Sequence, residues 1–320
     1  MILITGCNSL LGKALIKALL KQGEQVRGFD LYKEKDFPEK AEFFQGNLLD
    51  QTQLKIICQG IKTIFHLMEI KKPGKDNQKF IKKVNIEGTS NILVAAKNAE
   101  VKKFFFLSSF AVYGNLKDIP FRQDSPKKPI SKYGKQKLKA EKICWKYITE
   151  DSLDITIFRP ALIAGAGVDN QIILSMLYLA LAMGEENKMY LAGKGDTRFQ
   201  LLHPDDALQA FLAAYKSKNQ KGKVYNLGSD QVLTQIEQVL KIKENSTFSI
   251  KYISPFKIKF LALASRLFKF SFFSKEHVYF LLNNMILDCQ KAKKELKWTP
   301  QKNNIDIMLE IIEWYKKEKL

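Results

Sequence analysis

The chain has little of what metal centres and disulfide frameworks require. Its 320 residues include three histidines and four cysteines. The cysteines are widely separated and form no CxxC pair, so we predict no metal site and reduced, structural thiols. The sequence also lacks a secretory leader and any run of about 18 apolar residues, the length that a membrane span needs. These absences favour a cytoplasmic protein.

Arginine is scarce as well, and this bears on the charge. The formal net charge of +19 comes from 52 lysines and arginines against 33 acidic residues, yet only five of the basic residues are arginine. Nucleic-acid-binding proteins gather basic residues on one face, often with arginine for reading bases. Here the lysines are spread along the chain, which indicates a solvated surface and no nucleic-acid partner. The charge also favours anionic substrates.

Short apolar runs alternate with segments of helical periodicity over the first 160 residues. Strands are predicted at 1–5, 25–30, 42–45, 62–66, 103–107 and 153–158, and helices at 11–20, 50–59, 78–98 and 131–147. This alternation predicts an α/β fold with a doubly wound parallel sheet, a Rossmann domain over residues 1–160.

The pattern becomes irregular in residues 161–320, which we expect to form a smaller, mostly helical, substrate-binding lobe with segments that return to the sheet. Helices are predicted at 170–183, 204–216, 234–241, 256–269 and 305–317, and strands at 189–191 and 223–226. Residues 256–273 place basic and aromatic side chains on opposite sides of a helix. We favour a helix packed on the core over one lying on an anionic membrane surface.

The first predicted strand ends in a glycine turn that leads into a helix. Gly6 allows the turn, Gly12 allows close packing of helix on strand, and the helix N-terminus offers N–H groups to a pyrophosphate. Ser9 stands where a middle glycine is usual, and its hydroxyl can donate to phosphate. The turn therefore predicts a dinucleotide site.

Two polar residues at the ends of later strands extend this site. Asp30 can accept hydrogen bonds from both ribose hydroxyls, which favours NAD over its 2′-phosphorylated relative, although Lys33 lies close enough to weaken the preference. Asn47 has an amide that suits an adenine edge, but a plain turn residue is an equally good interpretation.

Tyr133 and Lys137 are four residues apart, so both project from one face of a predicted helix. A phenol has a pKa near 10 and is a poor base at neutral pH, but a nearby ammonium and a nicotinium charge favour its phenolate. Tyr133 can then exchange a hydroxyl proton with a substrate, and Lys137 can bind the nicotinamide ribose. Ser109, at the end of the preceding predicted strand, can hold the same substrate oxygen.

With these motifs in place, the sequence resembles the extended short-chain dehydrogenase/reductase family, specifically its NAD-dependent epimerase/dehydratase group. The resemblance also rests on segments 66–67, 84–89, 108–114, 159–160, 203–206, 225–228 and 288–300. It implies that Ser109, Tyr133 and Lys137 form the catalytic set. Further implied contacts to the cofactor come from Asn8, Leu10, Leu11, Leu48, His66, Leu67, Asn85 and Pro160.

The resemblance also implies a partner and a substrate class. Members bind nucleotide sugars and commonly form homodimers through the two long helices, here 78–98 and 131–147. Residues 193–200 resemble the loop that closes over the nucleotide, with Arg198 and Gln200 as substrate contacts. In the same region, His203 is expected to hold the loop to the following helix start rather than to bind a ligand.

Two departures from the group narrow the prediction. Met68-Glu69 replaces the small pair that usually lies beside the cofactor, and this carboxylate could disfavour phosphates or contact substrate. Phe110-Ala111 stands where the 4,6-dehydratases carry an Asp-Glu pair, so dehydration by that mechanism is not expected.

Our leading hypothesis is an NAD-dependent nucleotide-sugar epimerase in which Tyr133 takes a sugar hydroxyl proton while hydride passes to NAD and later returns to the other face. One alternative is an NAD(P)-dependent dehydrogenase or reductase of a hydroxyl or ketone substrate, which an apolar pocket lined by 256–273 would favour. The other is a non-catalytic dinucleotide-binding scaffold, which Ser9 and Glu69 suggest and the intact catalytic set argues against. NADP is the less favoured cofactor.

Overall fold

The parallel sheet predicted from the sequence forms the centre of the molecule. The computed structural model describes residues 1–70, 78–114, 118–151, 153–168, 188–244, 249–260 and 275–319. Seven parallel strands lie in the order β10-β6-β5-β4-β1-β2-β3. They are β1 (Ile2–Thr5), β2 (Val26–Asp30), β3 (Glu42–Gln45), β4 (Thr63–His66), β5 (Lys103–Leu107), β6 (Ile155–Pro160) and β10 (Val224–Leu227). The strand order reverses between β1 and β4, where ligands bind in such sheets.

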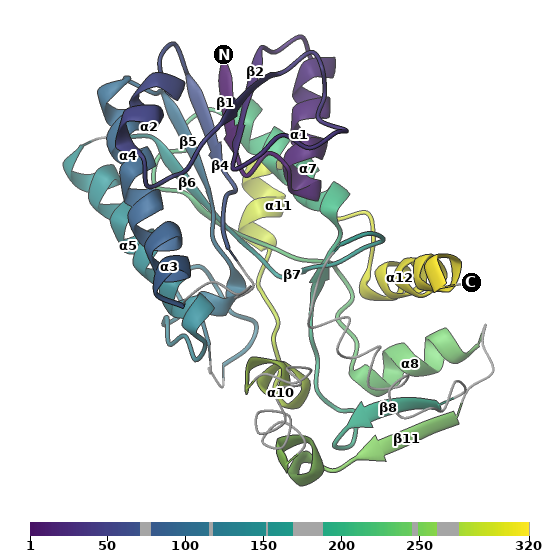
Figure 1. The fold of residues 1–320 in the computed structure, drawn as a ribbon. Coiled ribbons are helices and arrows are strands. Elements are labelled where there is room, and N and C mark those ends of the chain that lie inside the picture. Colours follow the sequence, from purple (N-terminus) through teal and green to yellow (C-terminus); the bar gives the residue numbers. More distant parts are fainter. Residues whose placement is uncertain are drawn as a thin grey trace.

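Helices cover both faces of this sheet, as Figure 1 shows. One face carries α1 (Leu10–Lys21), α7 (Pro204–Lys216) and α11 (Gln290–Leu296); the other carries α2 (Gln51–Ile57), α4 (Thr89–Asn98) and α5 (Lys132–Glu150). Each layer has its own apolar core, the first around Leu15 and Phe211 and the second around Leu54, Ile92 and Ala140. The doubly wound fold class is therefore confirmed.

The long helix predicted at 78–98 contains an irregular turn. It runs as α3 (Gln78–Lys83), a π-helical turn η1 (Val84–Gly88) and α4. A Cβ on Gly88 would lie 2.7 Å from Cβ of Leu48, and the Thr89 hydroxyl donates to the Asn85 carbonyl at 2.9 Å. Such turns often occur at functional sites, and this one lies beside the carboxyl end of β4, where His66 contacts Thr89.

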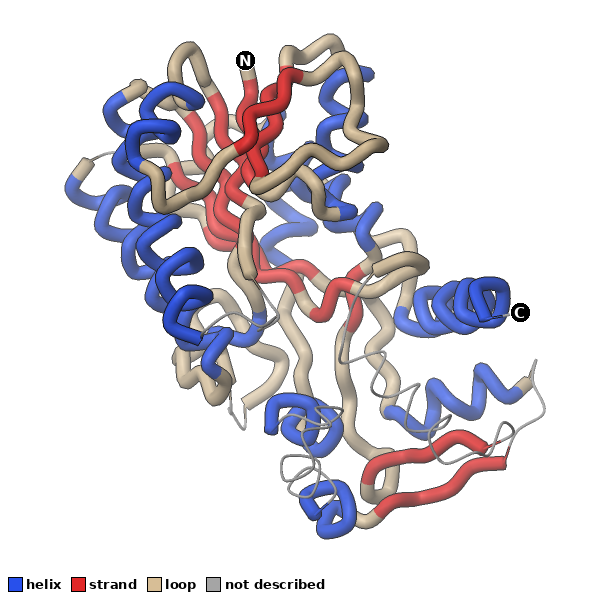
Figure 2. Tube along the Cα trace, in the orientation of Figure 1, coloured by secondary structure: helices blue, strands red, loops and turns tan. Residues whose placement is uncertain are grey.

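The second half of the chain contributes to the sheet and also builds a lobe. Strand β10 is the seventh strand of the sheet, and α7 and α11 pack on one face of it. Two short parallel pairs were not predicted as pairs: β7 (Leu162–Ile163) with β9 (Leu201–Leu202), and β8 (Lys188–Ala192) with β11 (Ser249–Ile253). Figure 2 shows the β8–β11 pair at the far end of the lobe. The lobe's described helices include α8 (Gln235–Lys243), α10 (Lys275–Leu282) and α12 (Asn304–Lys319).

One predicted lobe helix lies wholly, and another partly, outside the described residues. The helix predicted at 170–183 lies outside the described residues. Of the one predicted at 256–269, only 256–260 are described, and they are helical. Within the described chain, none of the helices combines the length and apolar character needed to span a bilayer.

All four cysteines are free and buried. Burial raises the pKa of the Cys7, Cys58 and Cys289 thiols to about 12, and that of Cys144 is raised as well. Because the thiolate is the reactive form, these side chains are packing residues.

Candidate active site

The glycine turn after β1 is built by close backbone approach. Gly6 has a φ of +76°, and a Cβ there would lie 2.7 Å from the backbone N and Cα of Met68. A Cβ on Gly12 would lie 2.5 Å from the Gly6 carbonyl oxygen. Both positions therefore require glycine, and the turn brings the N-terminus of α1 against the segment that follows β4.

Ser9 braces this turn. It is the N-cap of α1: its hydroxyl accepts from the Gly12 N–H at 3.0 Å and donates to the Gly6 carbonyl at 2.8 Å. The Ser9 hydroxyl, which we predicted could donate to a phosphate, therefore donates its hydrogen to the Gly6 carbonyl within the turn. Leu10 is exposed and Leu11 is buried against the sheet.

Asp30 joins the end of β2 to the glycine turn. Its carboxylate accepts from the backbone N–H of Asn8 at 3.0 Å and of Leu31 at 2.9 Å, and burial nevertheless raises its pKa. The side-chain Oδ1 of Asn8 is buried without a hydrogen-bond partner. An unsatisfied buried acceptor beside a half-buried carboxylate fits a ligand that brings hydroxyl donors, as an adenosine ribose does. Lys33 instead places its Nζ 5.7 Å from the Phe37 ring centroid.

The neighbouring predicted cofactor residues, Asn47 and Leu48, make internal contacts. The Asn47 side chain accepts from the Leu49 N–H at 3.0 Å, which is the contact of a turn residue. Leu48 is buried against Gly88. Their roles toward a cofactor stay predictions.

His66 links the first strand to the π-helical turn. Its Nδ1 lies 2.7 Å from the Thr5 hydroxyl, and its Nε2 lies 3.1 Å from the Thr89 hydroxyl. Thr89 donates its own hydrogen to Asn85, so it accepts from the imidazole Nε2. Burial, followed by the charge of Lys137, lowers the His66 pKa to about 3. The imidazole is therefore neutral and fixes the end of β4, from which Leu67 donates to the Thr5 carbonyl.

Asn85 clamps the segment that follows β4. Its amide accepts from the Ile70 N–H at 2.9 Å, donates to the Ile70 carbonyl at 3.0 Å and donates to the Gln136 side chain at 2.9 Å. The Asn85 side chain thus joins three elements: the β4 extension (residues 67–70, which follow β4), η1 and α5.

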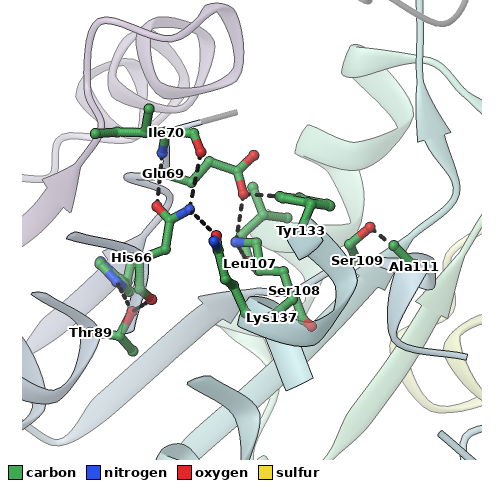
Figure 3. A network of polar contacts seen from close by, with 12 residues as sticks. His66, Glu69, Ile70, Thr89, Leu107, Ser108, Ser109, Ala111, Tyr133 and Lys137 are labelled. Atoms are coloured by element: carbon green, nitrogen blue, oxygen red, sulfur yellow. Dashed lines mark hydrogen bonds and ion pairs between the residues drawn. The ribbon is translucent and has the colours of Figure 1, made fainter. Parts of the chain in front are cut away.

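The three predicted catalytic residues lie around the end of β5 (Figure 3). Tyr133 and Lys137 come from the first turns of α5, which Ser131 caps by accepting from the Gly134 N–H at 2.9 Å. Lys137 donates to the Leu107 carbonyl at 2.6 Å. Ser109 caps the short helix η2 (Phe110–Val112), where its hydroxyl accepts from the Ala111 N–H at 3.2 Å.

Close backbone contact docks the start of α5 onto η2. A Cβ on Gly134 would lie 2.3 Å from the Ala111 carbonyl oxygen, so only glycine permits this approach. This contact keeps Tyr133, on α5, and Ser109, at the start of η2, on neighbouring elements.

Glu69 completes this group of side chains; the sequence marked its carboxylate as a departure beside the cofactor but did not predict its contacts with Tyr133 and Lys137. Its Oε2 lies 2.6 Å from Lys137 Nζ and accepts from the Tyr133 hydroxyl at 3.0 Å. The two side chains of the ion pair are 5% and 8% exposed, for Lys137 and Glu69 respectively. The available signal was a carboxylate at a position where a small residue is usual.

A second buried network lies one turn further along α5. Arg159 binds both carboxylate oxygens of Glu141, at 2.9 and 2.6 Å, and donates to the Tyr113 hydroxyl at 2.9 Å. Ser108 also donates to Glu141. This network fixes the end of β6, where Pro160 lies buried beside β10.

The two predicted substrate residues have different surroundings. Arg198 is exposed, and its main chain bonds to Asn284 and Met285. Gln200 is buried, and its amide donates to the Ser229 carbonyl at 2.6 Å and accepts from the Leu287 N–H at 2.9 Å. The substrate roles of both stay predictions. His203 is the N-cap of α7 and accepts from the Asp205 N–H at 3.2 Å, which confirms the predicted contact with the helix start; its hold on residues 193–200 stays a prediction.

Comparison with known proteins gives the same picture of the fold. Residues 2–228 match the sequence model of the NAD dependent epimerase/dehydratase family. An uncharacterized protein of Sinorhizobium fredii, y4nG, is 31% identical over 98% of this chain and 78% of its own length. A UDP-glucose 4-epimerase of Lactobacillus helveticus is 26% identical over 98% of this chain and 97% of its own. The crystal structure of UDP-glucuronic acid 4-epimerase from Bacillus cereus in complex with NAD superposes with a TM-score of 0.78 at 22% identity, covering 100% of this chain and 99% of that one.

Proposed function

The chain belongs to the NAD-dependent epimerase/dehydratase family, and from that premise we propose that it is an NAD-dependent nucleotide-sugar epimerase. The observation that carries the proposal is that Tyr133 and Lys137 lie together beside the end of β5, with Lys137 Nζ 5.9 Å from the Tyr133 ring centroid, next to a glycine turn that accepts no side chain at Gly6 or Gly12. One relative in sequence and one neighbour in structure are 4-epimerases of UDP-sugars, which supports a UDP-sugar as the substrate.

Each proposed role follows from the position of a side chain. Tyr133 exchanges the proton of the sugar hydroxyl, because its phenol lies at the carboxyl edge of the sheet and projects from the same helix as Lys137. Ser109 holds the same sugar oxygen from the start of η2. Asp30 and the glycine turn hold the adenosine and pyrophosphate parts of NAD. When bound, NAD supplies a reversible hydride acceptor, which side chains lack.

The test is to incubate the purified chain with NAD and UDP-glucose or UDP-glucuronic acid and to separate the 4-epimers. We expect epimers to form without net production of NADH. Tyr133→Phe, which removes only the hydroxyl, should slow epimer formation by about 10²- to 10⁴-fold. Tyr147→Phe on the same helix is the matched control and should leave the rate near that of the wild type.

The alternative functions predict different outcomes. Steady consumption of NADH with a ketone, and no epimer, would contradict the proposal and identify a reductase of the same family. Tight NAD binding with no turnover, unchanged by Tyr133→Phe, would identify a non-catalytic scaffold.

We also propose a homodimer formed through α3, α4 and α5. Large apolar side chains on these helices are exposed: Phe80, Val94 and Trp145. A second copy of the chain would remove them from water. A monomeric mass in light scattering would contradict this part of the proposal.

A further inference from the structure

Glu69 places a carboxylate between the two side chains on which the proposed chemistry depends. A single oxygen, Oε2, lies 2.6 Å from the Lys137 ammonium and accepts the hydrogen bond of the Tyr133 phenol at 3.0 Å. Figure 3 shows the carboxylate lying between the two side chains. The Lys137 ammonium also donates to the Leu107 carbonyl.

The backbone on both sides of Glu69 is anchored, so the position of the carboxylate is built into the fold. Before it, the Leu67 N–H donates to the Thr5 carbonyl, and the backbone of Met68 lies so close to Gly6 that a Cβ there would not fit. After it, both backbone polar groups of Ile70 bond to the Asn85 amide. The two anchors leave the side chain of Glu69 directed at α5.

Within the part of the chain that the structure describes, the other titratable groups near Glu69, Lys137 and Tyr133 contribute little charge. His66 on β4 is neutral, because burial holds its pKa at about 3. Glu141, one turn along α5, is neutralised by Arg159 of β6. Lys132 and Lys135 lie on α5 as exposed side chains. Among the described residues, the formal charges that contact the Tyr133 hydroxyl or its partner are those of Lys137 and Glu69, and their sum is zero.

We propose that Glu69 is a positioning residue that holds Tyr133 in its protonated, proton-donating state by cancelling the charge of Lys137. A lone ammonium beside a phenol favours phenolate, whereas a carboxylate that accepts the phenol's hydrogen bond favours the protonated phenol. The proton stays on Tyr133 and does not move to Glu69, since the reference pKa values of the two groups differ by about six units.

The consequence for the proposed function is an order of events at the site. Tyr133 starts as a proton donor and becomes a proton acceptor only when a further positive charge offsets Glu69. This consequence rests on the proposed function, whereas the protonation state of Tyr133 can be measured without cofactor or sugar.

The experiment follows tyrosinate absorbance in the ultraviolet as the pH of the full-length chain is raised. The titration of Tyr133 is isolated by subtracting the curve of Tyr133→Phe, in the wild type and separately in Glu69→Gln. Glu69→Gln keeps the shape and an acceptor oxygen but removes the charge. We expect the midpoint of Tyr133 to fall by about one to three pH units in Glu69→Gln.

Two further variants keep the result decisive. Glu87→Gln removes an exposed carboxylate of η1, which pairs with Lys83 at 4.0 Å, and should leave the midpoint unchanged. Glu69→Asp keeps the charge at a shorter reach and should give a midpoint between those of the wild type and Glu69→Gln, and it serves alone if Glu69→Gln does not fold. A midpoint that is the same in the wild type and in every folded Glu69 variant would overturn the proposal. Failure of the epimerase assay would leave this titration unaffected, so the two proposals can fail separately.

Discussion

Helix α5 carries two buried ion pairs one turn apart, and they have different surroundings. Lys137 pairs with Glu69 from the β4 extension, and Glu141 pairs with Arg159 from β6; the shortest N–O distance is 2.6 Å in both pairs. The Glu141–Arg159 side chains are each 2% exposed and bind through two parallel contacts. In the other pair one carboxylate oxygen serves both an ammonium and a phenol.

The comparison shows that burial and distance do not by themselves define what an ion pair does. The hydrogen bonds of Arg159 all go to other groups of the protein. The guanidinium donates to Glu141, the Tyr113 hydroxyl and the Gln123 carbonyl, and Tyr113 donates in turn to Asn226. Such a network specifies one arrangement of β6, η2 and α5. The Lys137–Glu69 pair lies where the strand order reverses, and its carboxylate also accepts a hydrogen bond from Tyr133, a group that can gain or lose a proton. We therefore assign the first pair to structure and the second to the protonation of Tyr133.

The largest effect on the free energy of unfolding is expected when Arg159 is removed from its network with Glu141. Arg159→Met leaves Glu141 buried without its counter-charge, and the free energy of unfolding should fall by about 3–5 kcal/mol. Urea unfolding followed by tryptophan fluorescence measures this. The double variant Arg159→Met/Glu141→Leu removes both charges and should recover most of the loss. A single-variant loss below about 1 kcal/mol, typical of an exposed pair, would show that water reaches Glu141 and would end the distinction between the two pairs.

The architecture could be predicted because the strands of the seven-stranded sheet and the helices on its faces have recognisable local sequence patterns. The bounds of β3 and β5 match the predicted ranges 42–45 and 103–107, and Asp50 caps α2 by accepting from the Gln53 N–H. The β7–β9 pair has two residues in each strand, too few for any periodicity, and exists because segments distant in sequence meet. The π-helical turn likewise depends on the fit of Gly88 against Leu48.

The placement of the predicted catalytic side chains followed from the sequence more directly than their contacts did. The spacing of Tyr133 and Lys137 fixes a shared helix face, and the structure brings both to the end of β5. The direction of Glu69 is set by the anchoring of Leu67 and Ile70, which involves residues from three other elements. Sequence shows that a carboxylate is present, but only the assembled backbone shows that it is directed at Tyr133.

The second prediction concerns His66, whose pKa responds to the charges of the Lys137–Glu69 pair and makes the stability of the fold depend on pH. Burial and, secondarily, Lys137 lower its pKa to about 3 from 6.5, whereas Glu69 acts in the opposite direction. Between these values the unfolded chain binds a proton that the folded chain does not, so stability is lost as the pH falls from about 6.5 toward 3. The slope attributable to His66 approaches about 1.4 kcal/mol per pH unit.

His66→Gln should remove this component. The difference in unfolding free energy between the wild type and His66→Gln should be constant above about pH 7 and change by about 2–3 kcal/mol between pH 6.5 and 4.5, with the wild type losing more. Urea unfolding at a series of pH values measures it. Parallel curves for the two proteins across this range would mean that the folded chain protonates His66 readily.

The smallest effect is expected from Asn85, which acts on the Glu69 pair through the backbone. Asn85→Ala leaves the Ile70 backbone groups and the Gln136 side chain without their shared partner, so the free energy of unfolding should fall by about 1–2 kcal/mol. Since Ile70 is one of the two anchors of Glu69, the Tyr133 midpoint should also fall, by less than in Glu69→Gln. Asn91→Ala is the matched control, because Asn91, on α4, donates to the Leu48 carbonyl and accepts from the Gln51 side chain, and within the described residues it has no hydrogen bond to residues 67–70. It should lower stability without moving the titration. A titration that moves equally in both variants would mean that general loosening, and not the anchoring of Glu69, sets the state of Tyr133.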